Sequence, residues 1–307
     1  MTRVAFLFPG QGSQAVGMGK RFFEQAPLAR NLFDQADEIL GYKISKLCLE
    51  GPEEELRLTQ NTQPALLLVS TVAFRLLGMK PVLAAGHSLG EYSALVAAES
   101  LRFEDALRIV HRRGRYMQEA VPVGEGAMAA VLGLNYDDLI RAVSQVQSGV
   151  VQIVNWNSQE QLVIAGHKQA VEDALKLARP PRSVLLPVSA PFHSSLMKSA
   201  EERLAVDLDS VEFKDPAFPI VTNVDAKIIR TGAEARDSLK RQVSRPVLWY
   251  TSMEVLGGEA IEAFVELGAG KVLAGLIKRI ARLWPRPIAV WNVEDPDSLE
   301  KTRQSLL

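Results

Sequence analysis

The chain has 307 residues, of which 47% are hydrophobic and 23% charged, so it has the composition of a globular protein with a sizeable core. Its formal net charge of −1 provides no overall basic field, and nucleic-acid binding is therefore not expected. The single cysteine, Cys48, excludes an intrachain disulfide, and no stretch is apolar for long enough to span a membrane, so we expect a cytoplasmic protein without membrane contact.

Short apolar runs alternate with helical patterns in the first third of the chain. The patterns predict, in order, a buried strand over 4–8, a helix over 22–40, an irregular stretch over 47–61, an apolar helix opened by Pro64 and reaching Leu77, a strand over 82–85, and helices over 91–98 and 103–121. Because strands and helices alternate, we expect a parallel sheet with helices on both faces, which is an α/β fold.

The sequence Gly86-His87-Ser88-Leu89-Gly90 has the Gly-x-Ser-x-Gly pattern of a nucleophile elbow. The predicted strand before it and the predicted helix after it are the context that an elbow requires. Such a turn lifts the serine hydroxyl clear of the sheet, and the next backbone N–H, that of Leu89, points at whatever the serine attacks. We therefore interpret Ser88 as a catalytic nucleophile rather than a surface serine.

The helix predicted over 103–121 is amphipathic and carries a run of arginines. Its apolar residues recur at three- and four-residue spacing, namely Phe103, Ala106, Leu107, Val110, Gly114, Met117 and Val121. Arg112 and Arg115 fall on the opposite face and are expected to be solvated. Arg113 falls beside the apolar stripe, where a guanidinium needs an anionic partner from the protein or from a ligand.

The pattern changes after residue 126. The stretch predicts strands over 127–132, 150–156, 161–165 and 183–188, and helices over 135–146 and 168–178. This β-α-β-β-α-β order is ferredoxin-like, so we expect a small domain at 127–190 inserted into a catalytic domain made of 1–126 and 191–307. The remaining patterns predict helices over 194–208, 239–256 (with a break at Pro246) and 271–283, and strands over 219–224, 263–267 and 288–291.

A serine nucleophile needs a base, and four histidines are available. His87 lies inside the elbow, where its ring points away from the serine, and His111 and His167 are expected to be solvated or capping. His193 precedes a helix at the seam of the two predicted domains, and we expect the helix N-terminus to lower its pKa. No two histidines have the spacing of metal ligands and no cysteines cluster, so we expect no metal site.

The loop after the first strand allows a rival interpretation. Gly10-x-Gly12-x-x-Ala15 fits the glycine pattern of dinucleotide-binding folds. However, Pro9 separates it from the strand, and Asp34 and Asp37 lie in a helical pattern rather than after a second strand. No phosphate-binding GxxxxGK[ST] loop is present either, so the evidence for nucleotide binding is weak.

Four motifs together resemble the malonyl-CoA:acyl carrier protein transacylases, the acyltransferase family of fatty-acid and polyketide synthesis. They are Phe8-Pro-Gly-Gln-Gly-Ser-Gln14, Gly86-His-Ser-Leu-Gly-Glu-Tyr-Ser-Ala94, Pro191-Phe-His-Ser194 and Glu266-Leu-Gly-Ala-Gly-Lys271. The similarity runs in order over nearly the whole chain. It implies an α/β-hydrolase-like domain with a nucleophile elbow and a ferredoxin-like insert, in agreement with the element order.

The resemblance also implies a role for each matching residue. Ser88 carries the malonyl group as an ester, and His193 is its general base, oriented by the backbone carbonyl of Gln242 rather than by an aspartate. The implied oxyanion hole is the pair of backbone N–H groups of Gln11 and Leu89. On the substrate side, Arg113 binds the free carboxylate of malonate, and Phe192 resembles the residue of malonyl-selective members.

The implied reaction is a ping-pong transfer from malonyl-CoA to the phosphopantetheine thiol of acyl carrier protein, as part of fatty-acid or polyketide synthesis. No cofactor is implied, since CoA belongs to the substrate and the product, and a monomer is expected. A serine esterase or thioesterase could use the same elbow but would not need Arg113. A non-catalytic module that binds carrier protein is a second alternative, which an intact pair of Ser88 and His193 disfavours.

Overall fold

The main sheet of the computed structural model is built around the pentapeptide Val4–Phe8, whose side chains are all buried. Its strands are β1 (Val4–Phe8), β2 (Leu83–Gly86), β7 (Ile220–Val221), β8 (Ile228–Ile229), β9 (Ala263–Leu267) and β10 (Ala289–Val293). Within residues 2–188 and 190–306, which the structure describes, this sheet has six strands in the order β10-β9-β1-β2-β7-β8. Neighbouring strands are parallel except for β7 and β8, so the expected α/β sheet is present.

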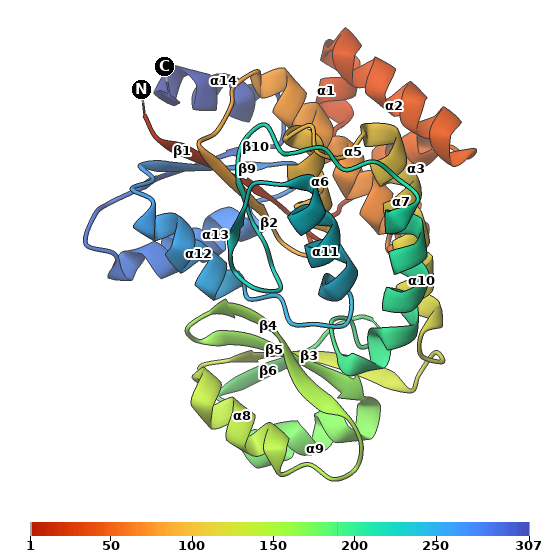
Figure 1. Cartoon of the computed structure of the whole chain (residues 1–307), viewed down its shortest axis with the longest axis vertical. Helices are drawn as coiled ribbons and strands as arrows, with labels where there is room; N and C mark the ends of the chain where they lie inside the picture. Colours follow the sequence, from red (N-terminus) through yellow and green to blue (C-terminus); the bar gives the residue numbers. More distant parts are fainter. Residues whose placement is uncertain (1, 189, 307) are drawn as a thin grey trace.

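Helices cover both faces of this sheet (Figure 1). Phe6 and Phe8 of β1 pack into a large apolar core, whereas Ala5 and Leu7, which point the other way, pack into a second one. The large core includes residues of α2 (Pro27–Leu40), α5 (Thr59–Leu77), α6 (Leu89–Ala97) and α7 (Phe103–Glu119), and the second includes residues of α12 (Trp249–Gly258) and α13 (Val272–Ile280). The result is a sheet between two helical layers.

The sequence prediction was wrong in detail between residues 20 and 61. The expected helix over 22–40 is divided into α1 (Lys20–Gln25) and α2, because Pro27 keeps Ala26 in an extended conformation. The stretch 47–61 is not irregular, since it contains α3 (Ile44–Glu50) and α4 (Glu53–Leu56). These short helices lack a long apolar repeat, so periodicity could not reveal them.

Pro64 lies inside α5 rather than at its start, because the helix begins at Thr59. A proline has no N–H, so the carbonyl of Gln60, four residues earlier, loses its usual helical donor. His111 supplies a replacement, with its Nδ1 donating to the Gln60 carbonyl at 2.9 Å. The approach of α7 is close here, since a Cβ on Gly114 would lie 2.6 Å from the Gln60 Cα. The proline is therefore tolerated through a contact between helices.

A small antiparallel sheet lies below the main sheet in Figure 1, with two helices on its outer face. Its elements are β3 (Gly126–Leu132), α8 (Tyr136–Ser144), β4 (Val151–Ser158), β5 (Gln161–His167), α9 (Lys168–Ala178) and β6 (Arg182–Leu185). The strand order is β4-β5-β3-β6. Asn135 caps α8 by accepting a hydrogen bond from the Asp138 N–H. The β-α-β-β-α-β order predicted from the sequence is therefore confirmed.

The small sheet is joined to the large part through backbone hydrogen bonds. The Trp156 N–H donates to the Val247 carbonyl at 3.0 Å, and the Val247 N–H donates to the Val154 carbonyl at 2.9 Å. Beside this bridge the Trp156 ring lies between Tyr136 and Tyr250, with centroids 4.9 and 5.2 Å away. Strand β4 and the segment before α12 are therefore held side by side.

The final third contains the predicted elements in the predicted order, with shifted boundaries and with β8 as an additional strand. A short 3₁₀ turn (Ser195–Met197) leads into α10 (Lys198–Asp209), and the helical pattern over 239–256 is divided between α11 (Gly232–Gln242) and α12, on either side of Pro246. The 3₁₀ turn Ala281–Leu283 follows α13. The C-terminal helix α14 (Pro296–Leu306) was not predicted. None of the described helices combines the length and apolarity needed to cross a membrane.

Candidate active site

Ser88 occupies the sharp turn between the end of β2 and the start of α6. Its backbone has φ 51° and ψ −104°, a conformation that an L-residue adopts only under constraint. The turn closes because its glycines touch other backbone: a Cβ on Gly86 would lie 1.9 Å from the Gly90 carbonyl carbon, and one on Gly90 would lie 1.9 Å from the Phe8 oxygen. These contacts explain both glycines of the motif.

The Ser88 hydroxyl is hydrogen-bonded to the imidazole of His193. The Ser88 Oγ lies 2.7 Å from His193 Nε2, and His193 Nδ1 lies 2.9 Å from the backbone carbonyl of Gln242. A carbonyl can only accept, so Nδ1 carries the proton and Nε2 is left free to accept from the serine. The structure thus brings together three residues that were predicted from the sequence, in the tautomer that a general base needs.

His193 is neutral in this environment. It is 4% exposed, and burial lowers its pKa to about 3, with the charge of Arg113 acting in the same direction. The physical cause differs from the one expected from the sequence, which was the N-terminus of a following helix. A short 3₁₀ turn separates His193 from α10, and burial is the largest cause of the lowered pKa.

Arg113 lies on the cavity side of α7 and is 1% exposed. Its Nη1 donates to Gln63 Oε1 at 2.7 Å, while Nη2 donates to Gln242 Oε1 at 2.9 Å and to Ser88 Oγ at 3.1 Å. Its partners here are neutral, and Arg113 forms no ion pair within the part of the chain that the structure describes. A buried cation beside the serine, held by neutral amides, is suited to receive an anionic ligand.

The neighbouring arginines point elsewhere, as predicted from the amphipathic pattern. Arg112 pairs with Asp207 at 2.8 Å and Arg115 with Glu119 at 3.6 Å, and both are about half exposed. The same helix therefore presents two arginines to solvent and one to the buried serine.

A cavity of about 460 Å³ opens over Ser88. Gln11 and Leu89 lie in its lining, and no hydrogen bond of their backbone N–H groups is found among the described residues. Phe192, which is buried, contributes to the apolar wall together with Met117. The small sheet supplies a further part of the wall, through Met128, Asn155, Asn157 and Val163.

The other three histidines are engaged in structural contacts. His87 Nε2 lies 2.9 Å from Asn157 Oδ1, and its ring packs near Trp249 with centroids 5.3 Å apart. His111 bonds to the Gln60 carbonyl, and His167 Nδ1 accepts from the Val150 N–H at 3.0 Å. None of these rings hydrogen-bonds to the Ser88 hydroxyl in the described chain.

The sequence did not reveal the polar residues that hydrogen-bond to the backbone of the elbow. Asn223 accepts from the Ser88 N–H at 2.6 Å and donates to the Gly86 carbonyl at 2.7 Å. Glu91 and the Gln242 side chain lie next to it, fully buried. Glu91 carried a detectable signal, because it is a carboxylate in an otherwise apolar helical run. Asn223 and Gln63 carried none.

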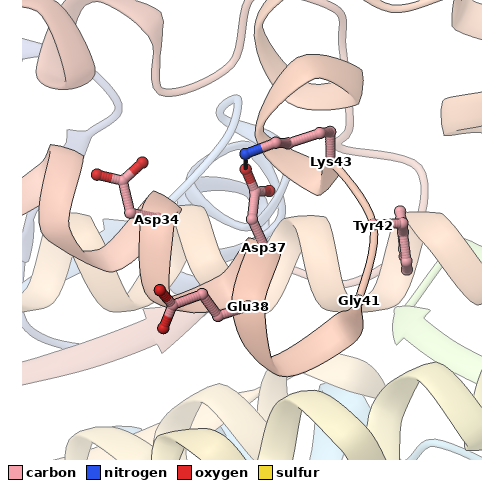
Figure 2. Close-up of a pocket in the computed structure, with 6 residues that line it drawn as sticks. All are labelled: Asp34, Asp37, Glu38, Gly41, Tyr42 and Lys43. Carbon is pink, nitrogen blue, oxygen red and sulfur yellow. Dashed lines mark ion pairs between the residues drawn. The ribbon is translucent and has the colours of Figure 1, made fainter.

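A second cavity, of about 540 Å³, is lined by the C-terminal half of α2 and the turn that follows it (Figure 2). Its buried carboxylate, Asp37, is already satisfied by Lys43 at 3.2 Å and by the N–H and hydroxyl of Ser45 at 2.9 and 2.7 Å. This cluster fixes the turn between α2 and α3. Throughout the described residues, no group of three or more His, Cys, Asp or Glu is arranged to hold a metal ion.

Comparison with known proteins identifies the family of the chain. A model of the acyl transferase domain family matches residues 5–279. The chain is 46% identical to the malonyl CoA-acyl carrier protein transacylase of Bacillus subtilis, over 100% of this chain and 98% of that protein, and 48% identical to that of Escherichia coli K12, over 91% and 93%.

Solved structures are similar over the same length. The malonyl CoA-acyl carrier protein transacylase of Coxiella burnetii superimposes with a TM-score of 0.96 at 40% identity, covering 99% of this chain and 98% of that one. A malonyl-transacylase in complex with its type II polyketide-synthase acyl carrier protein superimposes with a TM-score of 0.95 at 42% identity, covering 99% and 100%.

Proposed function

Because the chain belongs to the acyl transferase family, we propose that Ser88, His193 and Arg113 carry out its reaction. The protein transfers malonyl groups from malonyl-CoA to acyl carrier protein, a reaction of fatty-acid biosynthesis that type II polyketide synthesis also uses. One observation above all supports the roles of these residues. The Arg113 guanidinium, fully buried, donates to the same Ser88 Oγ that His193 contacts.

In the first half of the reaction, Ser88 Oγ attacks the thioester carbonyl carbon of malonyl-CoA while His193 Nε2 takes the hydroxyl proton. The Gln242 carbonyl, bonded to Nδ1–H, stabilises the imidazolium that forms. The tetrahedral intermediate then collapses with cleavage of the C–S bond. His193 returns its proton to the departing sulfur, so CoA leaves as a thiol and the malonyl group remains as an ester on Ser88.

In the second half, the phosphopantetheine thiol of acyl carrier protein enters the same cavity and gives its proton to His193. Its sulfur attacks the ester carbonyl, the C–O bond to Ser88 breaks, and the proton passes to Oγ. The enzyme is thereby restored, and malonyl leaves on the carrier protein.

The oxyanion of each tetrahedral intermediate is assigned to the backbone N–H groups of Leu89 and Gln11. The Ser88 N–H is already used by Asn223 at 2.6 Å, so it is unavailable for this purpose. The Leu89 N–H lies in the first turn of α6, where the helix leaves it without a backbone acceptor and where the helix dipole favours negative charge. Both properties suit a developing oxyanion.

Arg113 is assigned to the free carboxylate of the malonyl group. A guanidinium can hold a carboxylate through two parallel hydrogen bonds, and Gln63 and Gln242 fix its plane from the other side. A plain serine esterase has no use for a buried cation at this place. Phe192, in the wall of the cavity, is assigned to limiting the size of the acyl group.

We also propose how the chain is divided. The six-stranded sheet and its helices, over 1–126 and 191–307, make an α/β-hydrolase-like catalytic domain, and 127–190 makes an inserted ferredoxin-like domain (residues 1, 189 and 307 lie outside the described part). The strand order β4-β5-β3-β6 supports the second assignment. We assign the enzyme to the cytoplasm as a monomer, with malonyl-CoA and acyl carrier protein as its partners and no cofactor.

Mass spectrometry tests the proposal directly. The wild-type protein incubated with malonyl-CoA and no carrier protein should gain one malonyl group, located on the peptide that contains Ser88. Ser88→Ala should gain none and should retain the fold, as judged by circular dichroism. A malonyl adduct on the Ser88→Ala protein would overturn the assignment of the nucleophile.

A further inference from the structure

Glu91 is a fully buried carboxylate to which the reaction above assigns no role. It lies in the first turn of α6, directly behind the elbow. Burial raises its pKa, while its hydrogen-bond donors and the charge of Arg113 act in the opposite direction. A carboxyl group with no water contact is costly to bury unless its oxygens are satisfied, so its partners define what it does.

Three groups donate to this carboxylate. The Asn223 N–H donates to Oε2 at 2.9 Å, the Gln242 Nε2 donates to the same oxygen at 2.8 Å, and the Ser238 hydroxyl donates to Oε1 at 2.6 Å. Of these partners, Asn223 also holds the Ser88 N–H and Gln242 also holds Arg113. Glu91 is therefore connected to the nucleophile through Asn223 and to the guanidinium through Gln242.

The Gln242 side chain can take only one orientation between Glu91 and Arg113. Its Nε2 faces the Glu91 carboxylate and the Ser88 carbonyl, and its Oε1 faces the guanidinium of Arg113. Rotating the amide by half a turn would set its NH₂ group against the guanidinium and its oxygen against the carboxylate. Both contacts would then be repulsive, because each would join two donors or two acceptors.

From this arrangement we infer that Glu91 is a positioning residue for malonyl transfer, because it holds the Gln242 amide so that its oxygen keeps Arg113 beside Ser88. The inference rests on the proposed role of Arg113 as the site of the malonyl carboxylate. Glu91 touches neither substrate nor the reacting atoms. Its contact with Asn223 supports the elbow for every acyl group, whereas its contact with Gln242 affects the acyl preference.

The test compares malonyl with acetyl transfer, because an acetyl group has no carboxylate for Arg113 to bind. The rates of both transfers to holo-acyl carrier protein are measured for wild type, Glu91→Ala, Glu91→Gln and Ser252→Ala. Ser252 is a buried serine whose hydroxyl, among the described residues, bonds only to backbone carbonyls, so its variant controls for a general loss of packing. The malonyl-to-acetyl ratio cancels differences in the fraction of folded enzyme.

Glu91→Ala should lower this ratio roughly tenfold, since a hydrogen bond to a charged group is lost and Gln242 is released. Glu91→Gln can still accept from Gln242 and Asn223 with its oxygen while its NH₂ donates to Ser238, so its ratio should stay within about threefold of wild type. Ser252→Ala should keep the wild-type ratio. An unchanged ratio in Glu91→Ala, or an equal loss in Glu91→Gln, would overturn the inference.

Gln242→Met provides a second route if Glu91→Ala does not fold. Its backbone carbonyl still orients His193, but its side chain can no longer link Glu91 to Arg113. Its ratio should fall about as far as that of Glu91→Ala, by roughly tenfold, and adding Glu91→Ala to it should lower the ratio no further. An unchanged ratio in Gln242→Met, or a further loss in the double variant, would count against Glu91. The ratio of Arg113→Ala, measured alongside, tests the proposed role of Arg113 itself. If it falls while that of Glu91→Ala does not, only the inference about Glu91 fails.

Discussion

Replacing Arg113 is the change that should alter acyl selectivity most. Its guanidinium is 1% exposed and is held by Gln63 and Gln242 at 2.7 and 2.9 Å. A malonyl group on Ser88 would bring a carboxylate into this dry surrounding, where an unpaired charge is strongly disfavoured. Arg113 supplies the partner, and Arg113→Ala removes it.

The size of the effect follows from the bonds that are lost. A hydrogen bond to a charged group contributes about 1.5–3 kcal/mol, so losing the clamp should reduce malonyl transfer by roughly tenfold to a hundredfold. Acetyl transfer should be spared or raised, because the buried cation that disfavours an apolar acyl group is gone. Arg113→Lys should recover little of the malonyl rate, since an ammonium cannot form the planar two-bond contact.

The assay is the ratio of kcat/KM for malonyl-CoA to that for acetyl-CoA, with holo-acyl carrier protein as acceptor. Arg112→Ala is the matched control, because this arginine lies on the same helix but is half exposed and pairs with Asp207. Its ratio should equal that of wild type. If Arg113→Ala and Arg113→Lys also gave the wild-type ratio, Arg113 would have no role in acyl recognition and the reasoning would be refuted.

Three further predictions concern the base and the elbow. His193→Ala should lower the transfer rate by roughly 10² to 10⁴, as losses of a general base do, whereas Glu53→Gln at the cavity wall should cost far less; an equal loss would point to a carboxylate partner. Burial keeps the pKa of His193 at about 3, below its ordinary value of 6.5. Between these two pH values the unfolded chain binds a proton at this residue and the native protein does not. The free energy of unfolding is therefore unaffected by His193 above pH 6.5 and decreases as the pH falls from 6.5 toward 3. Denaturant titrations at pH 7 and pH 5 should therefore show wild type losing up to about 1.4 kcal/mol per pH unit below 6.5 relative to His193→Gln, and parallel pH profiles would contradict the assignment. Gly90→Ala should abolish the malonyl adduct because its Cβ would lie 1.9 Å from the Phe8 oxygen, whereas Gly275→Ala, with open space around the new Cβ, should remain active; full activity in Gly90→Ala would show that the elbow can relax.

The strands of the main sheet could be predicted largely from their composition. The runs Val4–Phe8 and Ala263–Leu267 have the predicted boundaries, because strands buried on both faces are almost entirely apolar, with Glu266 as the one charged residue of these two runs. By contrast α14 escaped prediction, since only Leu299 and Thr302 of this helix are buried and its pattern is weak. The start of α5 was misplaced because the contact that makes Pro64 tolerable comes from His111, 47 positions later in the chain.

The reactive groups of the site could be predicted from motifs, but their supports could not. Ser88 and Arg113 stand out in their local sequence, one between glycines and the other in an apolar stripe. Asn223 lies in an unremarkable loop, and only the folded chain brings it 2.6 Å from the Ser88 N–H. Such contacts join residues over a hundred positions apart, so they cannot be predicted from the local pattern of the sequence.

The segment between α11 and α12 has two attachments that lie close together on the chain. At Gln242 its carbonyl holds the imidazole of His193, and five residues later Val247 exchanges backbone hydrogen bonds with β4 of the small sheet. Pro246, between them, fixes one backbone torsion of this short connection. A displacement of the small sheet would therefore displace the short connection that leads from Val247 to Gln242, whose carbonyl orients the imidazole. The orientation of the base therefore depends in part on how the small sheet is attached to this segment.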